Sequence, residues 1–437
     1  MVMPFHYGND KERHLAAHNP RRLKTLVGAG PVIFAGNDQE PDKGIRRAAA
    51  LAKIAEREKI TGLFTADLLQ PDPDGPTGSQ EPIVALAALS QATAQIGLIA
   101  TVSTTYQHPY NLARMIGTLD HVSGGRAGWN AVTSSMGEEN FGGPGLPSPE
   151  SRYARAAEFI AVMNALYEAN DPQAAQRKPN GGITVDTRKL HPINHHGDFF
   201  QVAGPLNVPP SPQRRPVQFQ AGQSEAGVAL GARYAEVIYT SQPTFEDAQR
   251  FVAGVRQQAQ ALGRAVMPLI MNSFHSVIGD SPDDVARRLR EKHERIDYER
   301  GRLKVADMLG GELDLAHLPL DKPLPAALLP DISQVNRRRG RAEIFKRFAL
   351  QGLTLRELVV KAQETGHWFT AGTPESLADA IEERYRAGIL DVISLHGLGN
   401  PDQQDLLLNG LLPELRRRHL LDEDYLADNF RGNLGLV

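Results

Sequence analysis

Short apolar runs alternate with longer segments whose apolar residues recur at helical spacing along most of the chain. Near-continuous apolar runs of four to eight residues are typical of strands buried on both faces of a parallel sheet. We expect such strands at residues 60–67, 96–104, 127–134, 216–222, 236–241, 266–279 and 391–397, with a weaker candidate at 25–36. The segments between them predict helices.

Capping residues mark where several of these helices begin. Pro82 stands near the start of one helix, where a missing N–H costs little. Ser281 precedes Pro282 and is a good N-cap. Thr354 and Glu357 have the spacing of a capping box, so a helix is expected after them.

Eight strand–helix units in 437 residues predict a (β/α)8 barrel, that is a TIM barrel, and an open doubly wound sheet is the alternative. We expect one barrel domain over residues 1–437, with a C-terminal helical extension. Two segments interrupt the alternation, 170–215 and 298–352. Insertions of this length are usually functional, and the second is a candidate lid.

Composition and charge narrow the classes of function. The 48 basic and 51 acidic residues give a net charge of −3, which offers no reason to expect nucleic acid or a membrane as a partner. There is no cysteine, which excludes disulfides and thiolate chemistry. The first residues lack the apolar core of a signal peptide, and no apolar run reaches membrane-spanning length, so we expect a cytoplasmic protein.

Polar residues follow the expected strands, where a barrel carries its chemistry. Asn130 and Ser134 are four residues apart, so strand alternation predicts that both face the barrel mouth, while Trp129 packs behind them. These side chains could converge on one ligand. The polar residues at the strand ends are Asp67, Thr101, Ser103, Thr104, Thr105, Asn130, Thr133, Ser134, Ser135, Gln220, Ser224, Thr240 and Ser241.

The segment "AGQSEAG", residues 221–227, predicts an anion site. Small residues end a strand there and a helix begins at Ser224, so free N–H groups and a hydroxyl lie together. The alternative is an N-cap serine without a ligand. Tyr153 lies just inside the preceding helix, and its phenol could reach the same anion if that helix lies beside this rim.

Other motifs are weak. His191, His195, His196 and Asp198 lack the ligand spacing of a helical metal site, and we expect no metal. The stretch "VGAGPV" at 27–32 is an incomplete dinucleotide fingerprint. A phosphate cradle without a strong nucleophile or metal is typical of an enzyme whose bound cofactor performs the difficult step.

Longer stretches resemble the luciferase-like flavin-dependent monooxygenases, in the branch of the nitrilotriacetate, dibenzothiophene-sulfone and long-chain alkane monooxygenases. "LDHVSGGRAGWNAVTS" and "GPLNVPPSPQRRPV" are the most specific, and the similarity runs from about residue 55 onward. The resemblance implies a TIM barrel that uses reduced FMN as a co-substrate, O2 and a small organic substrate. It also implies a separate NAD(P)H-dependent flavin reductase and a dimer or tetramer.

The resemblance implies residues of the site as well. Those that stand where the family holds FMN are Asp67, Thr104, Asn130, Tyr153 and Ser224. Thr101 and Thr105 remain alternatives to Thr104. Asn130 and Ser134 stand beside the isoalloxazine ring and would orient the reacting oxygen. The implied reaction inserts one oxygen atom of O2 through a C4a-peroxy or hydroperoxy flavin.

Two departures from the family pattern keep alternatives open. Pro149 stands where the family often has a histidine, and residues 1–50 lack the usual "G-H-H-x-x-x-W-R" segment. An oxidoreductase that uses the deazaflavin F420 and a flavin-binding homologue without turnover are the other hypotheses. A nitrilotriacetate-like substrate would require an Arg- and Lys-lined pocket, whereas a sulfone or an alkane would require an apolar one.

Overall fold

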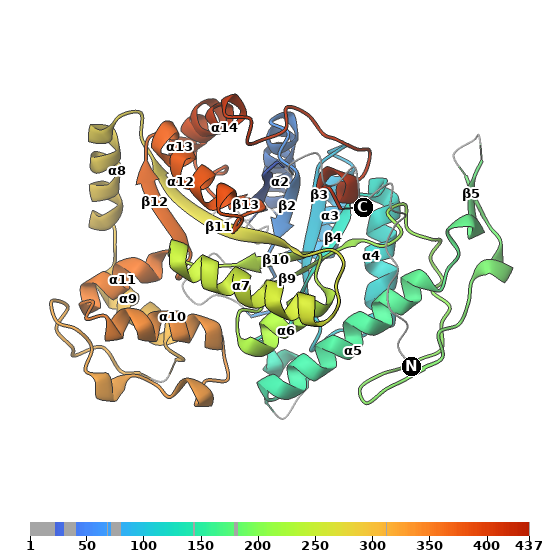
Figure 1. Ribbon diagram of the computed structural model, residues 1–437, viewed down its shortest axis with the longest axis horizontal. Helices are drawn as coiled ribbons and strands as arrows, with labels where there is room; N and C mark the ends of the chain where they lie inside the picture. The colour runs from blue at the N-terminus through green and yellow to red at the C-terminus, as the bar shows by residue number, and fades with distance from the viewer. Residues whose placement is uncertain are drawn as a thin grey trace.

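Eight parallel strands close into a barrel in the computed structural model, which describes residues 22–29, 41–67, 69–70, 80–142, 145–178, 182–311 and 313–436 (Figure 1). The order around the barrel is β10-β9-β4-β3-β2-β1-β13-β11, and β11 pairs again with β10. The strands are β1 (Lys24–Ala29), β2 (Gly62–Thr65), β3 (Gly97–Ser103), β4 (Ala127–Val132), β9 (Val217–Gln220), β10 (Val237–Thr240), β11 (Leu269–Ile278) and β13 (Val392–Leu395). The predicted TIM barrel is confirmed, and the open doubly wound sheet is wrong.

Every expected strand forms part of the barrel, including the weak candidate at 25–36, which is β1. A ninth strand, β12 (Trp368–Gly372), was not expected. Strand β11 has ten residues and extends beyond the other barrel strands. Its outer half, Phe274–Ile278, pairs with β12. The sheet is therefore extended on the side of the second insertion.

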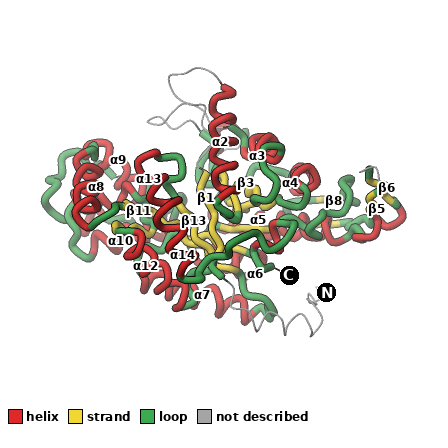
Figure 2. The backbone as a smooth tube through the Cα atoms, turned by 90° about the horizontal axis from the view of Figure 1, so that it is seen from above, coloured by secondary structure: helices red, strands yellow, loops and turns green. Residues whose placement is uncertain are grey.

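Helices surround the barrel (Figure 2). The capping serine at Ser281 and the Thr354–Glu357 capping box are both present as predicted. Helices form in the segments that were expected to be helical. They are α2 (Pro41–Arg57), α3 (Pro82–Ser90), α4 (Pro109–Ser123), α5 (Pro149–Glu168), α6 (Glu225–Tyr234), α7 (Phe245–Ala261), α8 (Pro282–Glu294), α11 (Leu355–Gln363), α12 (Pro374–Arg386), α13 (Pro401–Asp405) and α14 (Leu412–Arg417).

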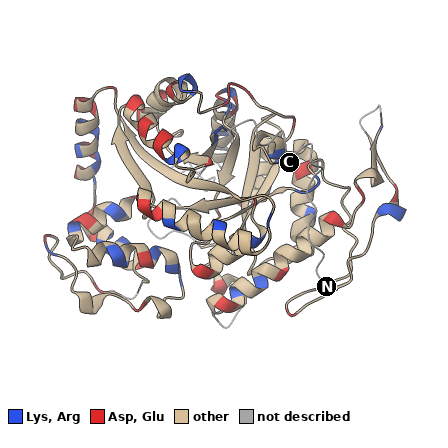
Figure 3. Cartoon of the chain, viewed as in Figure 1, with Lys and Arg blue, Asp and Glu red and all other residues tan. Residues whose placement is uncertain are grey.

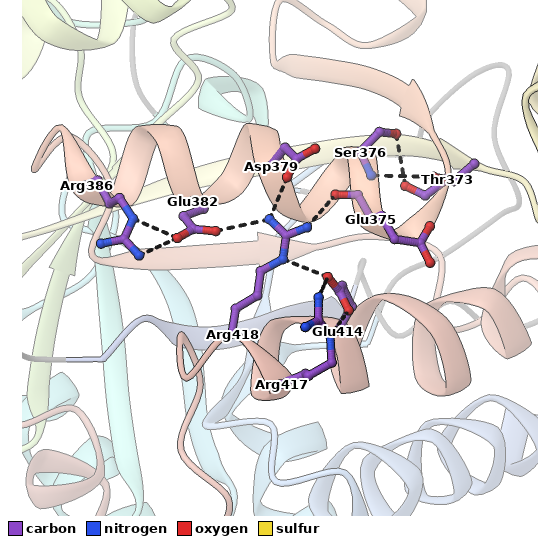
Figure 4. A network of polar contacts seen from close by, with 9 residues as sticks. All are labelled: Thr373, Glu375, Ser376, Asp379, Glu382, Arg386, Glu414, Arg417 and Arg418. Atoms are coloured by element: carbon purple, nitrogen blue, oxygen red, sulfur yellow. Dashed lines mark hydrogen bonds and ion pairs between the residues drawn. The ribbon is translucent and has the colours of Figure 1, made fainter.

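Charged residues of both signs are mixed along the outer helices, while the strands carry few of them (Figure 3). Arg418 shows how such charges join helices (Figure 4). Its guanidinium donates to Glu414 at 2.7 Å, to Asp379 at 2.6 Å and to Glu382 at 3.0 Å, which ties the end of α14 to α12. Across the described ranges, no helix combines the length and apolar character that crossing a membrane requires.

Side chains alternate between the barrel interior and the surrounding helices. Trp129 of β4 points outward and is buried against Phe159 of α5, with ring centroids 6.3 Å apart, as predicted. At the amino end of the barrel, Phe430 fills the interior and stacks on Phe219 at 6.2 Å. A Cβ on Gly97 would overlap the Phe430 ring, so the absence of a side chain at Gly97 makes room for this ring, which plugs the amino end of the barrel.

The two insertions have different structures. Residues 170–215 form the small hairpins β5 (Ala175–Arg177) with β6 (Ile183–Val185) and β7 (His195–His196) with β8 (Gln201–Val202), and the first projects away from the barrel. The second insertion, expected to be a long loop, contains the helices α9 (Tyr298–Met308) and α10 (Arg339–Leu350). These helices and α11 share an apolar core of their own, so this insertion is a packed helical unit.

Candidate active site

Two hydrogen-bonded pairs link β3 and β4 at the carboxyl end of the barrel. Asn130 lies opposite Thr101 in the ladder, and its Nδ2 donates to the Thr101 hydroxyl at 3.2 Å. Farther along, the Ser134 hydroxyl donates to the Ser103 hydroxyl at 2.6 Å. The structure therefore brings the two predicted catalytic residues to the same pair of strands.

Asn130 is left with an unused acceptor. Its side chain is 3% exposed, and its Oδ1 has no hydrogen-bond partner among the described residues. Burying a carbonyl oxygen without a hydrogen-bond donor costs on the order of 1–3 kcal/mol of folding free energy, so a ligand or a water molecule usually donates to such an atom. Thr101 fixes the amide so that this oxygen has a defined direction.

Ser134 was predicted to face the mouth because of strand alternation, but a turn after β4 determines its direction instead. Strand β4 ends at Val132, so alternation along the strand no longer fixes the direction of Ser134. The residue has a φ of 44°, in the left-handed region. Its carbonyl accepts a hydrogen bond from Arg152 at 2.8 Å, which holds this turn against α5.

The three candidate threonines differ in their contacts. Thr104 is fully buried, and both its N–H and its hydroxyl donate to the carbonyl of Val132, at 2.8 Å and 3.0 Å. Thr101 binds Asn130, while the Thr105 hydroxyl donates to the carbonyl of Thr133 at 2.8 Å. Thr104 can therefore offer a ligand only the acceptor side of its hydroxyl.

Asp67 occupies the rim beside these strands. It lies two residues beyond the end of β2 and is half-buried. Its position at the carboxyl end of a barrel strand agrees with the placement predicted from the sequence. Its role toward a ligand stays a prediction.

Ser224 and Tyr153 meet at the start of α6. The Ser224 hydroxyl accepts from the Gly227 N–H at 3.3 Å, as an N-cap does, and donates to the Tyr153 phenol at 3.3 Å. Helix α5 therefore lies beside this rim, which was the condition for Tyr153 to join the site. A Cβ on Gly222 would lie 2.9 Å from the phenol oxygen, so the glycine allows this close approach.

A network around Gln223, which sequence reasoning missed, fixes the loop that carries Ser224. The Gln223 Oε1 accepts from the Ser241 N–H at 3.2 Å and from the Gln242 amide at 3.0 Å. On the outer side, a Cβ on Gly340 would lie 3.4 Å from the Ser224 nitrogen. The second insertion therefore contacts the backbone at the start of α6.

Three histidines, also missed, stack across β11, β12 and β13. The ring of His275 lies 4.0 Å from that of His396 and 5.0 Å from that of His367. The Ser273 hydroxyl lies 2.9 Å from the His396 Nε2. Burial lowers the pKa of His396 to about 3 and lowers the pKa of His367 well below its usual value. Only His396, which stands at the end of an expected strand, gave a signal in the sequence, since His275 lies within β11 and His367 precedes the unexpected β12.

One histidine of the first insertion, His195, has a structural partner. The His195 Nε2 lies 3.0 Å from Glu158 of α5, and the same carboxylate accepts the N–H groups of Phe199 and Phe200. The described residues contain no group of three or more His, Asp or Glu that could hold a metal ion.

Pro149 has a local explanation. It is the first residue of α5, where proline is favoured, and Ser148 caps the helix by accepting from the Ser151 N–H at 3.2 Å. Residues 1–21 and 30–40 lie outside the described part, so the altered N-terminal segment has no structural account.

Comparison with known proteins gives the family. The model of the family "Luciferase-like monooxygenase" matches residues 29–391. The chain belongs to the luciferase-like monooxygenase family. Its recognition from the sequence, and the enzyme class of a flavin-dependent monooxygenase, are thereby confirmed.

Relatives of this luciferase-like chain point to one branch. It is 36% identical over 394 residues to N-acetyl-S-(2-succino)cysteine monooxygenase of Bacillus subtilis, covering 88% of both chains. It is 34% identical to nitrilotriacetate monooxygenase component A of Aminobacter aminovorans, covering 90% of both. A crystal structure of riboflavin lyase with modified FMN and riboflavin superposes with a TM-score of 0.78 at 28% identity, over 95% of this chain and 96% of the other.

Proposed function

We propose that this protein is the oxygenating component of a two-component monooxygenase. It would take reduced FMN from a separate NAD(P)H-dependent flavin reductase and insert one oxygen atom of O2 into a small organic substrate. The hydrogen bond between Tyr153 and Ser224 at the start of α6 carries this proposal, because it places two hydroxyl groups beside free helix N–H groups at the barrel mouth.

The residues at the start of α6 suit a phosphate. The first-turn N–H groups of a helix carry a partial positive charge and are free to donate. The Tyr153 phenol keeps its own hydrogen available, because it accepts from Ser224 in the present contact. Tyr153, Ser224 and the backbone of α6 would therefore hold the phosphate of FMN.

The unpartnered oxygen of Asn130 suits the flavin ring. An isoalloxazine carries an N–H group, and Oδ1 of Asn130 is a buried acceptor without a donor. The bond to Thr101 would keep this amide from rotating. Thr104 and Asp67 would border the ring from β3 and β2.

Reduced FMN, when bound, would supply the electrons that activate O2. The chain's own task is to keep water out and to fix the reacting groups in position. Phe64 and Tyr239 stack at 5.4 Å inside the barrel and close it beneath the mouth. Because the Ser134 hydroxyl donates to that of Ser103, the Ser103 hydroxyl keeps its own hydrogen and would donate it to the reacting oxygen while Ser134 orients it, and such a bond counts for more in a dry site than in water.

The second insertion would act as the lid. Its helix α10 begins against Gln223 and Ser224, so a movement of this helix would change access to the proposed phosphate site. Arg152 contributes to the same closure, since it donates to the carbonyl of Ser134 at 2.8 Å and to that of Asn336 at 2.8 Å.

Oxygenation in 18O2 tests the proposal. The purified protein is mixed with a flavin reductase, NADH, FMN and a panel of carboxylated amines, thioethers, sulfones and alkanes. The proposal predicts a product that contains one 18O atom and that forms only when the reductase is present. Peroxide without any labelled product, or product formation without reduced flavin, would contradict it.

A further inference from the structure

Arg341 differs from the other arginines whose pKa is lowered by burial. Arg126, for comparison, donates to oxygen atoms of Ser90, Thr93, Ser123 and Ile96 at 2.7 to 3.0 Å. Burial lowers the pKa of Arg341 to about 10, yet its guanidinium makes no hydrogen bond or ion pair with any residue that the structure describes.

The nearby carboxylate is already engaged. Asp307 acts on Arg341 through its charge, but its ion pair goes to Arg338, with Oδ2 and Nη1 2.9 Å apart. Arg341 is half-buried, and a partly desolvated cation without a counter-ion is unfavourable. Such a cation is retained most readily where a ligand brings the missing negative charge.

The position of Arg341 connects it to the barrel mouth. It follows Gly340, which lies against Gln223 and Ser224, and a Cβ on Gly366 would lie 3.3 Å from its Cδ. Its positive charge acts on Tyr239, inside the barrel, and on His367. The ring of His367, the residue after Gly366, lies 6.0 Å from that of Tyr239, so Arg341 lies at the mouth on the side of β10 and β12.

We propose that Arg341 binds a carboxylate of the substrate, which makes this enzyme selective for anionic substrates. The inference rests on the proposed function. A guanidinium presents its N–H groups in a planar fork that matches a carboxylate. The buried Nδ1 of His367 has no hydrogen-bond partner in the described chain and would face the same group.

The phosphate of FMN carries the same kind of charge and is the other source of an anion. That phosphate has a separate set of groups, namely Tyr153, Ser224 and the first-turn N–H groups of α6. The Cδ of Arg341 lies beside Gly366, next to His367 with its unpartnered buried Nδ1, and this position favours the substrate.

Thermal unfolding of the protein without added ligands is the first test. R341M removes a half-buried charge that has no partner among the described residues, so the midpoint of unfolding should rise, as it does when a functional site is relieved of its strain. R300M is the matched control, because Arg300 is an exposed arginine of the same insertion. A midpoint that falls in R341M but not in R300M would mean that Arg341 has a structural role, which overturns the proposal.

Calorimetric titration with nitrilotriacetate, N-acetyl-S-(2-succino)cysteine, FMN and riboflavin is the second test. R341M should weaken binding of at least one carboxylate about ten- to a hundredfold. R341K should recover part of this loss, and R300M should leave the affinity unchanged. The affinity for FMN should stay as in the wild type.

The outcomes separate this inference from the proposed function. If R341M weakens FMN but neither riboflavin nor the carboxylates, the anion is the flavin phosphate and the proposal is overturned. It is also overturned if the wild type binds none of the carboxylates, or binds them as R341M does. If carboxylate binding depends on Arg341 while no oxygenation occurs, the proposed function fails and the anion site stands.

Discussion

The hydroxyl of Ser224 donates to the phenol oxygen of Tyr153 at 3.3 Å and so joins the start of α6 to α5. The two residues are 71 positions apart in the sequence. Ser224 is also the N-cap of α6. Its hydroxyl therefore has a structural role and a proposed binding role, and a matched pair of variants can separate them.

Replacement of Ser224 by alanine should lower the free energy of unfolding by about 1 kcal/mol, because the N-cap is lost. Ser281 caps α8 with the same geometry, its hydroxyl accepting from the Asp284 N–H at 3.3 Å. S281A should therefore cost a similar amount in urea denaturation. Only S224A should also weaken FMN, and equal FMN affinities in the two variants would remove Ser224 from the site.

Replacement of Asn130 by alanine should uncouple the reaction. Loss of the buried amide should reduce product formed per NADH about tenfold or more, with peroxide released instead, because a hydrogen bond in a dry site is worth on the order of 1–3 kcal/mol. Both quantities can be measured in the reductase-coupled assay.

Asn170 provides the control for Asn130. It is also 3% exposed with an unpartnered Oδ1, but it binds the Leu206 carbonyl in the first insertion, away from the mouth. N170A should lower stability and leave coupling intact. The same loss of coupling in both variants would attribute the effect of N130A to general destabilisation.

Stability should fall as the pH falls below about 6.5, because His396 is held neutral in the folded protein. Burial lowers its pKa from 6.5 to about 3, so between these values the unfolded chain binds a proton that the folded chain does not. One such histidine changes the free energy of unfolding by up to about 1.4 kcal/mol per pH unit.

Urea denaturation at a series of pH values checks this linkage. H396N should reduce the slope below about pH 6.5, because one of the two histidines whose pKa burial lowers strongly has been removed, while His367 still contributes. H196N replaces an exposed histidine of the β7–β8 hairpin and should leave the slope unchanged. A slope that is the same in H396N as in the wild type would contradict the assignment.

Truncation of Phe430 should destabilise the barrel without affecting the mouth. F430A removes the ring that fills the amino end and stacks on Phe219, and large-to-alanine changes of this kind cost about 3–5 kcal/mol. L426A alters an exposed residue of the same segment and should cost little. FMN affinity measured below the unfolding transition should be unchanged in both, and a loss of FMN binding in F430A would link the two ends of the barrel.

The barrel could be predicted because its strands are buried on both faces and appear as continuous apolar runs. β12 was not predicted, because three of its five residues are only partly buried and give no clear hydrophobic pattern. The contact of Phe430 with the barrel interior was not predicted for another reason. A single aromatic residue in a polar stretch has no periodicity that would reveal its contact with the barrel interior.

The candidate site likewise contains residues that could be predicted from the sequence and residues that could not. The N-cap at Ser224 is a local feature, and its sequence was sufficient to predict it. Arg341, His367 and His396 come from separate elements, and only the closure of the barrel and the folding of the second insertion bring them near the mouth. No spacing along the chain could indicate that Arg341 would lie there without a counter-ion.

Anaerobic titration with reduced FMN and reduced riboflavin tests the central claim most directly. The two ligands differ only in the phosphate, which the account assigns to Tyr153, Ser224 and the start of α6. The wild type should bind reduced FMN at least about tenfold more tightly than reduced riboflavin, and Y153F combined with S224A should abolish most of this preference. Equal affinities of the wild type for the two ligands, or an undiminished preference in the double variant, would contradict it.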